Sequence, residues 1–167
     1  MRPAPERILD GGVRLVAAFE HSGTARQLVH VLKYRGLTHY ADLVVEMVGP
    51  RVPRLPIVPV PRAWTRQLAY GIDPARELAM RLARYLDVPL CDVLTPPAHS
   101  RRRAGGDHSR PAPPFAARTL VPGQFVLVDD VVTTGATIRS AANSLGFHRL
   151  ALVVAANAAD TVSSQSV

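Results

Sequence analysis

Two adjacent carboxylates follow an apolar run in the sequence. The stretch FVLVDDVVTTGAT, residues 125–137, places Asp129 and Asp130 after four apolar residues and before a threonine-rich turn. Two like charges this close repel each other, so a purely structural role would favour one acid or none. Carboxylates accept hydrogen bonds, and the adjacent hydroxyls of a ribose are suitable donors. The pair therefore predicts a ligand that supplies hydroxyl donors, with a bound cation relieving the repulsion.

The residues after the acids suit a phosphate group. They are Thr133, Thr134, Gly135, Ala136 and Thr137. We expect a turn that leads into a helix, whose first N–H groups lack partners within the helix and, with the helix dipole, favour an anion. Glycine lets the backbone approach the ligand, and the hydroxyls add donors. The stretch predicts a sugar 5-phosphate with its phosphate in the turn and its diol on the acids. The alternative is a threonine N-cap with solvated acids.

Other phosphate-binding motifs are missing from the sequence. There is no G-x-x-x-x-G-K-[ST] motif and no lysine after Lys33, which excludes a P-loop nucleotide hydrolase. There is no G-x-G-x-x-G motif for a dinucleotide either.

Apolar periodicity and turn residues predict the elements that position these residues. Residues 1–22 predict a lead-in with one edge strand in VRLVAAF. We expect helices at 24–36, 39–48, 74–86 and 136–146, and strands at 54–61, 88–94, 125–130 and 149–157. Strands that alternate with helices predict an α/β fold, a central parallel sheet flanked by helices on both faces. Residues 1–157 would form this single domain, with a mobile loop at 95–118 and a polar tail at 158–167.

Composition narrows the class of protein. The 167 residues are 47% hydrophobic and carry a net charge of +7, with only one lysine among the 20 basic residues. A basic protein suits an anionic partner, either a phosphorylated small molecule or a nucleic acid, although a basic surface alone is also compatible. No apolar run reaches the roughly 18 residues of a membrane span, and no secretory signal is apparent. One cysteine excludes a multi-cysteine zinc site. These features predict a cytoplasmic protein.

Several stretches together resemble a known family. FVLVDDVVTTGATIRSAA resembles the phosphoribosyl-diphosphate-binding motif of type I phosphoribosyltransferases. LVHVLKYRGLTHYADLVVEM and IVPVPRAWTRQLAYG resemble segments of the competence protein F (ComF) family, often called amidophosphoribosyltransferase-like. The chain lacks the paired-cysteine zinc module that precedes these segments in that family. It has Ala69-Tyr70-Gly71-Ile72-Asp73-Pro74 where the family usually reads R-G-F-N-Q, so the Asn-Gln pair is lost. The resemblance implies a type I phosphoribosyltransferase-like fold that binds phosphoribosyl diphosphate and Mg²⁺.

The resemblance also implies roles for individual residues. Asp129 and Asp130 match the ribose-binding acids, which meet Mg²⁺ only through the bound ligand, and residues 133–137 match the 5-phosphate loop. The loop that faces pyrophosphate is matched by Pro59, Val60, Pro61 and Arg62, and an N-terminal block without a settled role is matched by Lys33, Tyr34 and Gly36.

The function and one loop stay open at this point. Arg62, Asp129 and Asp130 are the candidate catalytic residues for displacing pyrophosphate from the ribose. Arg101, Arg102 and Arg103 would neutralise the leaving group on a closing lid, or else form a solvated charge run or a nucleic-acid contact. The alternative function is a non-enzymatic ComF-like protein that acts in DNA uptake or processing.

Overall fold

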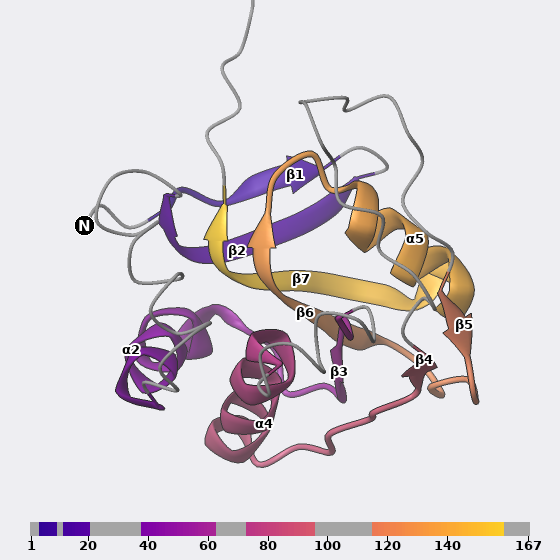
Figure 1. Ribbon diagram of the computed structural model, residues 1–167, viewed down its shortest axis with the longest axis horizontal. Coiled ribbons are helices and arrows are strands. Elements are labelled where there is room, and N and C mark those ends of the chain that lie inside the picture. Colours follow the sequence, from indigo (N-terminus) through magenta and orange to yellow (C-terminus); the bar gives the residue numbers. More distant parts are fainter. Residues whose placement is uncertain (1–3, 10–11, 21–37, 63–72, 96–114, 159–167) are drawn as a thin grey trace, which may run out of the picture.

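A five-stranded sheet lies at the centre of the molecule (Figure 1). The structure is a computed structural model, and it describes residues 4–9, 12–20, 38–62, 73–95 and 115–158. The strand order is β1-β2-β7-β6-β3. The strands are β1 (Arg7–Leu9), β2 (Val13–Glu20), β3 (Ile57–Pro59), β6 (Phe125–Val132) and β7 (Leu150–Ala158). β2, β7, β6 and β3 pair in parallel, and β1 pairs antiparallel with β2. The predicted α/β class with a mostly parallel sheet is confirmed.

Helices cover both faces of this sheet. α2 (Thr38–Val48) and α4 (Pro74–Leu86) lie on one face, and α5 (Ala136–Leu145) lies on the other (Figure 1). Successive residues of a strand point to opposite faces. In β6, Val126 and Val128 therefore pack with α2 and α4, whereas Phe125 and Leu127 pack with α5. Because each strand serves two apolar layers, β6 and β7 read as almost continuous apolar runs.

The position of the first long strand differs from the prediction. VRLVAAF was expected at the edge of the sheet, but β2 lies inside it, between β1 and β7. Five consecutive residues of β2, Leu15 to Phe19, are buried. Such a continuous apolar run is typical of an interior parallel strand, whereas an edge strand would alternate. The edge is formed by β1, within the segment that we had expected to be a lead-in.

Local sequence explains the ends of β3 and α4. β3 is an edge strand that stops at Pro59, where prolines are tolerated because the outer N–H is not needed. α4 begins as predicted, with Asp73 as N-cap and Pro74 at the first helical position. It ends at Asp87, which adopts the left-handed conformation at φ 54°.

The segment between α4 and β6 contains more β-strand pairing than expected. Within the predicted strand 88–94, Leu90 makes only an isolated bridge to Ile57, and pairing begins at β4 (Leu94–Thr95). β4 pairs antiparallel with β5 (Ala116–Ala117), although residues 95–118 were expected to be a loop. These short strands fix the two ends of that segment beside each other. Residues 96–114, the predicted helix at 24–36 and residues 159–167 lie outside the described residues.

An ion-pair network joins the two helices of one face. Arg81 of α4 donates to Glu77 one turn earlier at 2.7 Å and also to Asp42 of α2.

In the described part of the chain, no helix combines the length and the apolar character that a bilayer crossing needs.

Candidate functional site

The two aspartates lie where β6 loses one of its neighbours. β3 ends at Pro59, which is in register with Val128, and the Val60 N–H still donates to the Val128 carbonyl at 2.9 Å. β6 was expected to stop at Asp130, but it continues for two more residues beside β7. Asp129 and Asp130 therefore stand just beyond the end of β3. The four parallel strands end on this side of the sheet. We call this side the carboxyl edge; the term refers to the carboxyl ends of the strands and not to an outer strand such as β1 or β3.

Asp129 is a buried carboxylate with an elevated pKa. The residue is 9% exposed, and one side-chain oxygen accepts the Asp130 N–H at 2.7 Å. Burial is the main cause that raises the pKa of Asp129 well above its usual range, and the nearby negative charge of Asp130 raises it further. A group in this state is stabilised by a cation or by hydrogen-bond donors that approach it.

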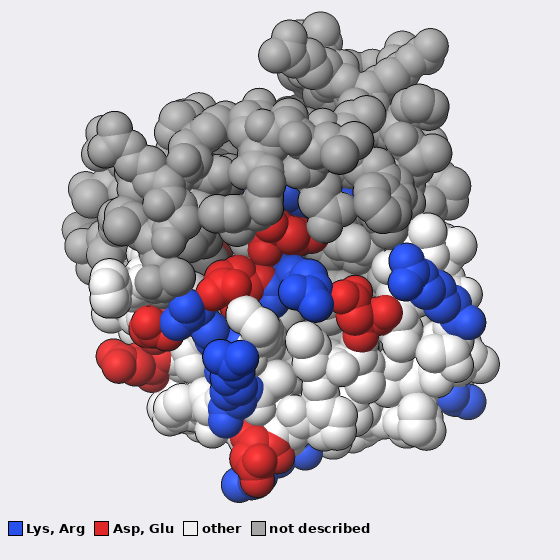
Figure 2. Space-filling view, turned by 60° about the horizontal axis from the view of Figure 1, so that its bottom comes forward, with Lys and Arg blue, Asp and Glu red and all other residues white. Residues whose placement is uncertain are grey.

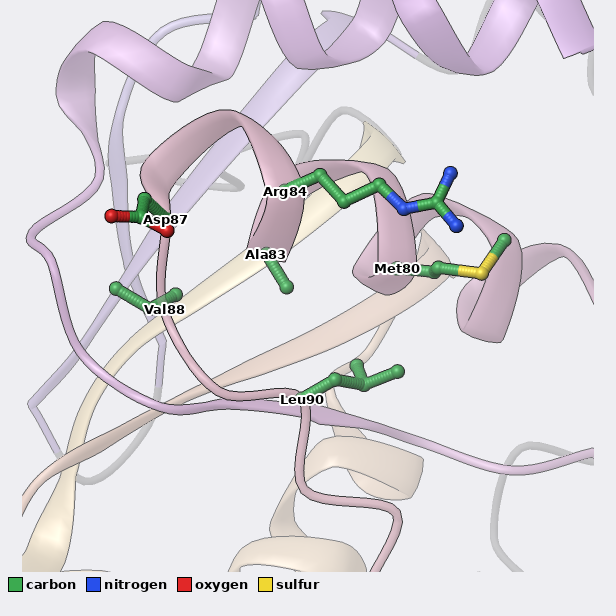
Figure 3. A pocket seen from close by; sticks show the side chains of 6 residues that line it. All are labelled: Met80, Ala83, Arg84, Asp87, Val88 and Leu90. Atoms are coloured by element: carbon green, nitrogen blue, oxygen red, sulfur yellow. The ribbon is translucent and has the colours of Figure 1, made fainter.

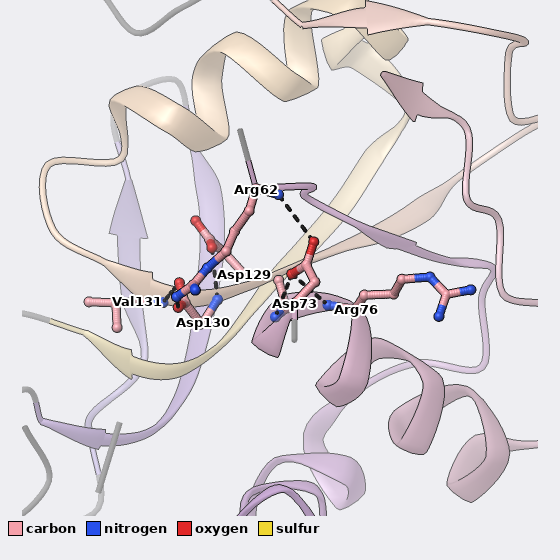
Figure 4. Close-up of polar contacts among 7 residues, drawn as sticks. Arg62, Asp73, Arg76, Asp129, Asp130 and Val131 are labelled. Atoms are coloured by element: carbon pink, nitrogen blue, oxygen red, sulfur yellow. Dashed lines mark hydrogen bonds and ion pairs between the residues drawn. The ribbon is translucent and has the colours of Figure 1, made fainter. Parts of the chain in front are cut away.

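Asp130 forms an ion pair with an arginine from the neighbouring segment. The Arg62 Nη2 donates to the Asp130 carboxylate at 3.1 Å, and the two side chains are only 13% and 15% exposed (Figure 4). The other Asp130 oxygen accepts the Val131 N–H at 2.9 Å. One acid of the pair, Asp130, is thus already bound by an arginine of the protein itself. A guanidinium carries donors on two further nitrogens, so Arg62 can hold an anion while it contacts Asp130.

Asp73 is a third carboxylate of this site, and the sequence indicated it only as a helix cap. One oxygen accepts the Ala75 and Arg76 N–H groups at 3.1 and 3.3 Å, and the other accepts the Arg62 N–H at 3.1 Å (Figure 4). Burial raises the pKa of Asp73, and the N–H of Arg62 opposes that rise. A contact across ten residues from a cap to a loop leaves no pattern in the sequence, so this role could not be predicted.

Buried polar side chains gather at the carboxyl edge. Among the described residues, the polar or charged side chains that are buried are Asp73, Asp129 and Asn157. Asn157 lies near the end of β7 and accepts a hydrogen bond from the Tyr40 hydroxyl at 3.4 Å. Burial raises the pKa of Tyr40 to about 12, so its hydroxyl stays a neutral donor. Since polar groups are costly to bury, their grouping at one edge indicates a functional site there.

The turn after β6 leads into α5 as predicted. Thr133 and Thr134 are exposed, and no side chain among the described residues caps the start of α5. The Ala136 N–H donates to the Thr134 hydroxyl, but at a long distance of 3.5 Å. The first N–H groups of α5 thus have no side-chain cap within the described part of the chain, and helix starts of this kind bind anions in other proteins.

The structure gives a conformational reason for glycine at position 135. It adopts φ 71°, a left-handed conformation that side chains disfavour. A Cβ added there would meet the Leu9 side chain at 3.7 Å, which is an ordinary contact. Glycine is thus required for the backbone conformation of the turn, and no clash with neighbouring atoms adds to that requirement.

The structure brings most of the candidate site residues to one edge. Asp129, Asp130 and Arg62 are linked directly, and the turn at 133–137 follows β6 at the same edge. Of the segment Pro59 to Arg62, Pro59 belongs to β3, and Arg62 contributes its side chain to the site. The residues Arg101, Arg102, Arg103, Lys33, Tyr34 and Gly36 lie outside the described residues.

A protein-only metal centre is not found in the described part of the chain. No group of three or more His, Cys, Asp or Glu side chains there is arranged to hold a metal ion. Asp129 and Asp130 offer carboxylate oxygens, which suit Mg²⁺ when a ligand's phosphates supply further oxygens. The residues therefore fit an ion that arrives with a phosphorylated ligand.

The described surface is almost balanced in charge. Of the 20 Lys and Arg residues, 11 lie in the described part, against 10 of the 13 Asp and Glu residues, so that part carries +1 and the rest of the sequence +6. Figure 2 shows acidic and basic side chains interspersed over the face that carries α2 and α4. The described residues of this face therefore form no single-sign patch of the kind that attracts a nucleic-acid backbone.

A separate hollow lies beside the second half of α4 (Figure 3). Its volume is about 280 Å³, and its lining residues are Met80, Ala83, Arg84, Asp87, Val88 and Leu90. Ligand sites usually enclose about 300–1,000 Å³ and contain converging polar groups. Arg84 and Asp87 extend away from each other in Figure 3, so the hollow does not meet this description. The carboxyl edge is the better candidate.

Comparison with known proteins adds no family assignment. A scan of the sequence against protein-family models found no match, and a search of curated proteins found none either.

Proposed function

We propose that this protein binds phosphoribosyl diphosphate together with Mg²⁺ and transfers its ribosyl 5-phosphate group, on a fold of the type I phosphoribosyltransferase kind. One observation carries the proposal. Buried Asp129 and partly buried Asp130 lie at the carboxyl edge of a parallel sheet, and the turn after them leads to a helix start at Gly135 that no side chain among the described residues caps. Ligands of open parallel sheets bind at this edge.

Each part of the ligand has a matching group. The 5-phosphate would accept hydrogen bonds from the first N–H groups of α5 and the hydroxyls of Thr133, Thr134 and Thr137. The ribose diol would donate to Asp129 and Asp130, replacing some of the repulsion that raises the pKa of Asp129. The pyrophosphate would accept from the Arg62 guanidinium, which already stands against Asp130.

The reaction requires the protein mainly to position the ligand and to stabilise the charge that develops on the leaving group. The C1–O bond of the ribose breaks, pyrophosphate leaves with the electron pair, and an acceptor forms a new bond to C1. Arg62 would stabilise the charge that grows on the leaving group, and Asp129 and Asp130 would orient the ribose. Mg²⁺ carried by the phosphates would neutralise further charge there.

The ComF-like function in DNA uptake or processing is the second candidate. Within the described part of the chain, the near balance of charges does not favour it. The same titrations distinguish the two functions, because DNA binding depends strongly on salt and would not require the acid pair.

Titration calorimetry with phosphoribosyl diphosphate and Mg²⁺ tests the proposal. We expect saturable binding that weakens about tenfold or more in Asp129→Asn and Asp130→Asn, since each loses a charged acceptor. Asp87→Asn is the matched control, because it removes the same charge from a carboxylate that is 95% exposed at the far end of α4. Absence of binding, or equal affinity in all three variants, would overturn the proposal. Salt-sensitive binding of single-stranded DNA without a ligand response would favour the second candidate.

A further inference from the structure

The two carboxylate oxygens of Asp73 accept hydrogen bonds from two different segments of the chain. The Oδ1 atom caps α4 through the N–H groups of Ala75 and Arg76, at 3.1 and 3.3 Å. The Oδ2 atom lies on the other side of the carboxylate and accepts the Arg62 N–H at 3.1 Å. A cap needs only one acceptor, which serine, threonine or asparagine supplies as well. Capping alone therefore does not account for a charged group that is only 8% exposed.

The Arg62 backbone needs an anchor at this point of the chain. β3 has ended, and the last sheet contact is the Val60 N–H on the Val128 carbonyl. Pro61 has no N–H to donate. The N–H of Arg62 is thus the next donor after Val60, and Asp73 accepts it.

Arg62 is consequently held at both ends. Asp73 binds its backbone, and Asp130 binds its guanidinium at 3.1 Å. A long side chain with many rotamers reaches one position reliably only when its backbone is fixed. Figure 4 shows Arg62 between the two carboxylates, one at the start of α4 and one on β6.

We propose that Asp73 is a positioning residue, which sets the place of Arg62 in the site through the Arg62 N–H and acts through that arginine. For its effect on ligand affinity, the inference rests on the proposed function. The anchoring itself is a property of the protein and can be tested without any ligand.

Asp73→Asn separates the two tasks. The asparagine oxygen can still accept from Ala75 and Arg76, but its NH₂ group then faces the Arg62 N–H, and two donors cannot bond. Asp73→Ser is a second variant that also retains a cap and is too short for Arg62. In both, amide hydrogen exchange at Arg62 should accelerate about tenfold or more, the equivalent of a lost hydrogen bond to a charged group. Exchange at the N–H of Arg76 should change little.

Asp87→Asn is the matched control for this measurement. It makes the same change at the other end of α4, at a left-handed position that asparagine tolerates. Exchange at Arg62 should be unaltered in it. Unchanged exchange at Arg62 in Asp73→Asn, or equal acceleration at Arg62 and Arg76, would overturn the inference, because Asp73 would then be only a cap.

A double-mutant cycle tests the effect on the ligand. Asp73→Asn should weaken binding of phosphoribosyl diphosphate several-fold in the wild-type protein, and much less when Arg62 is already alanine. Equal effects in both backgrounds would show that Asp73 does not act through Arg62. If the wild-type protein does not bind the ligand, the proposed function fails, whereas the exchange result still decides the inference.

Discussion

Asp129 differs from an exposed aspartate because burial and the charge of Asp130 both oppose its ionisation. Its carboxyl group therefore keeps a proton in the folded protein at pH values at which the unfolded chain, with a pKa of about 3.9, has lost it. The folded state binds more protons in this range, so stability should fall as the pH rises from about 4 through the folded pKa of Asp129.

Asp129→Asn should reduce this fall, because asparagine cannot ionise but can still accept the Asp130 N–H. At pH 7 we expect the variant to be more stable than the wild-type protein by about 1 kcal/mol, because it removes the cost of burying a carboxyl group that ionises next to a like charge. Urea unfolding between pH 4 and pH 8 measures this, with Asp87→Asn as control. Parallel curves for wild type and Asp129→Asn would contradict the assignment of an elevated pKa.

At the level of elements, the turn between β6 and α5 depends on the conformation of Gly135. A side chain in the left-handed region costs about 1–2 kcal/mol, and asparagine tolerates this region better than branched residues do. Because an added Cβ would only touch Leu9 at a normal distance, the backbone should dominate the cost. Gly135→Val should lose about 1–3 kcal/mol of stability and Gly135→Asn less than about 1 kcal/mol, both measured by urea unfolding. Equal losses would indicate that space, and not φ, decides at this position.

The contact between α2 and α4 offers a second prediction about elements. Arg81 joins Asp42 of α2 to Glu77 of α4 and is 22% exposed, whereas the Arg76–Asp92 pair is about half exposed. Partly buried networks contribute more than exposed pairs, whose value is about 0–1 kcal/mol. Arg81→Ala should therefore destabilise the protein by about 1–2 kcal/mol in thermal or urea unfolding. Arg76→Ala should lose under about 0.5 kcal/mol, and the reverse order would disprove this account of the helix pair.

Over the whole molecule, the sequence predicted where elements with local signals begin and end. It predicted less well which strands lie next to each other in the sheet. Asp73 and Pro74 marked the start of α4, and the prolines after Ile57 marked the end of β3. The continuous apolar run of β2 is typical of an interior strand, but it does not show which strand is its neighbour, so the pairing with β7 could not be recognised. Strand order depends on contacts between segments far apart in the chain, which local patterns do not record.

The site was predictable to a similar extent. The acid pair, the turn at 133–137 and Arg62 carry recognisable residue types, and they lie at one edge of the sheet. The Arg62–Asp130 ion pair joins residues that are 68 positions apart, and the Asp73 contact with Arg62 joins a cap to a loop. Both follow from how β3, α4 and β6 meet in three dimensions.

The packing of β3, α4 and β6 around the site leads to a prediction for the molecule as a whole. A ligand that contacts β6, the start of α5 and Arg62 together binds only the folded protein, because the unfolded chain separates these groups. At a phosphoribosyl diphosphate concentration of 100 times its Kd, with Mg²⁺, binding should add about 2.7 kcal/mol of stability. For a chain of this length that corresponds to a rise in Tm of roughly 5–10 °C in a thermal scan.

Ribose 5-phosphate and pyrophosphate, added separately, should each give a smaller rise, since each engages only part of the edge. Asp130→Asn should reduce the rise with the full ligand because it removes the negative charge of a diol acceptor and disturbs Arg62, whereas Asp87→Asn should retain it. A rise that survives in Asp130→Asn, or that pyrophosphate alone reproduces in full, would mean that the ligand is held as an anion without its sugar. The acid pair would then need another explanation.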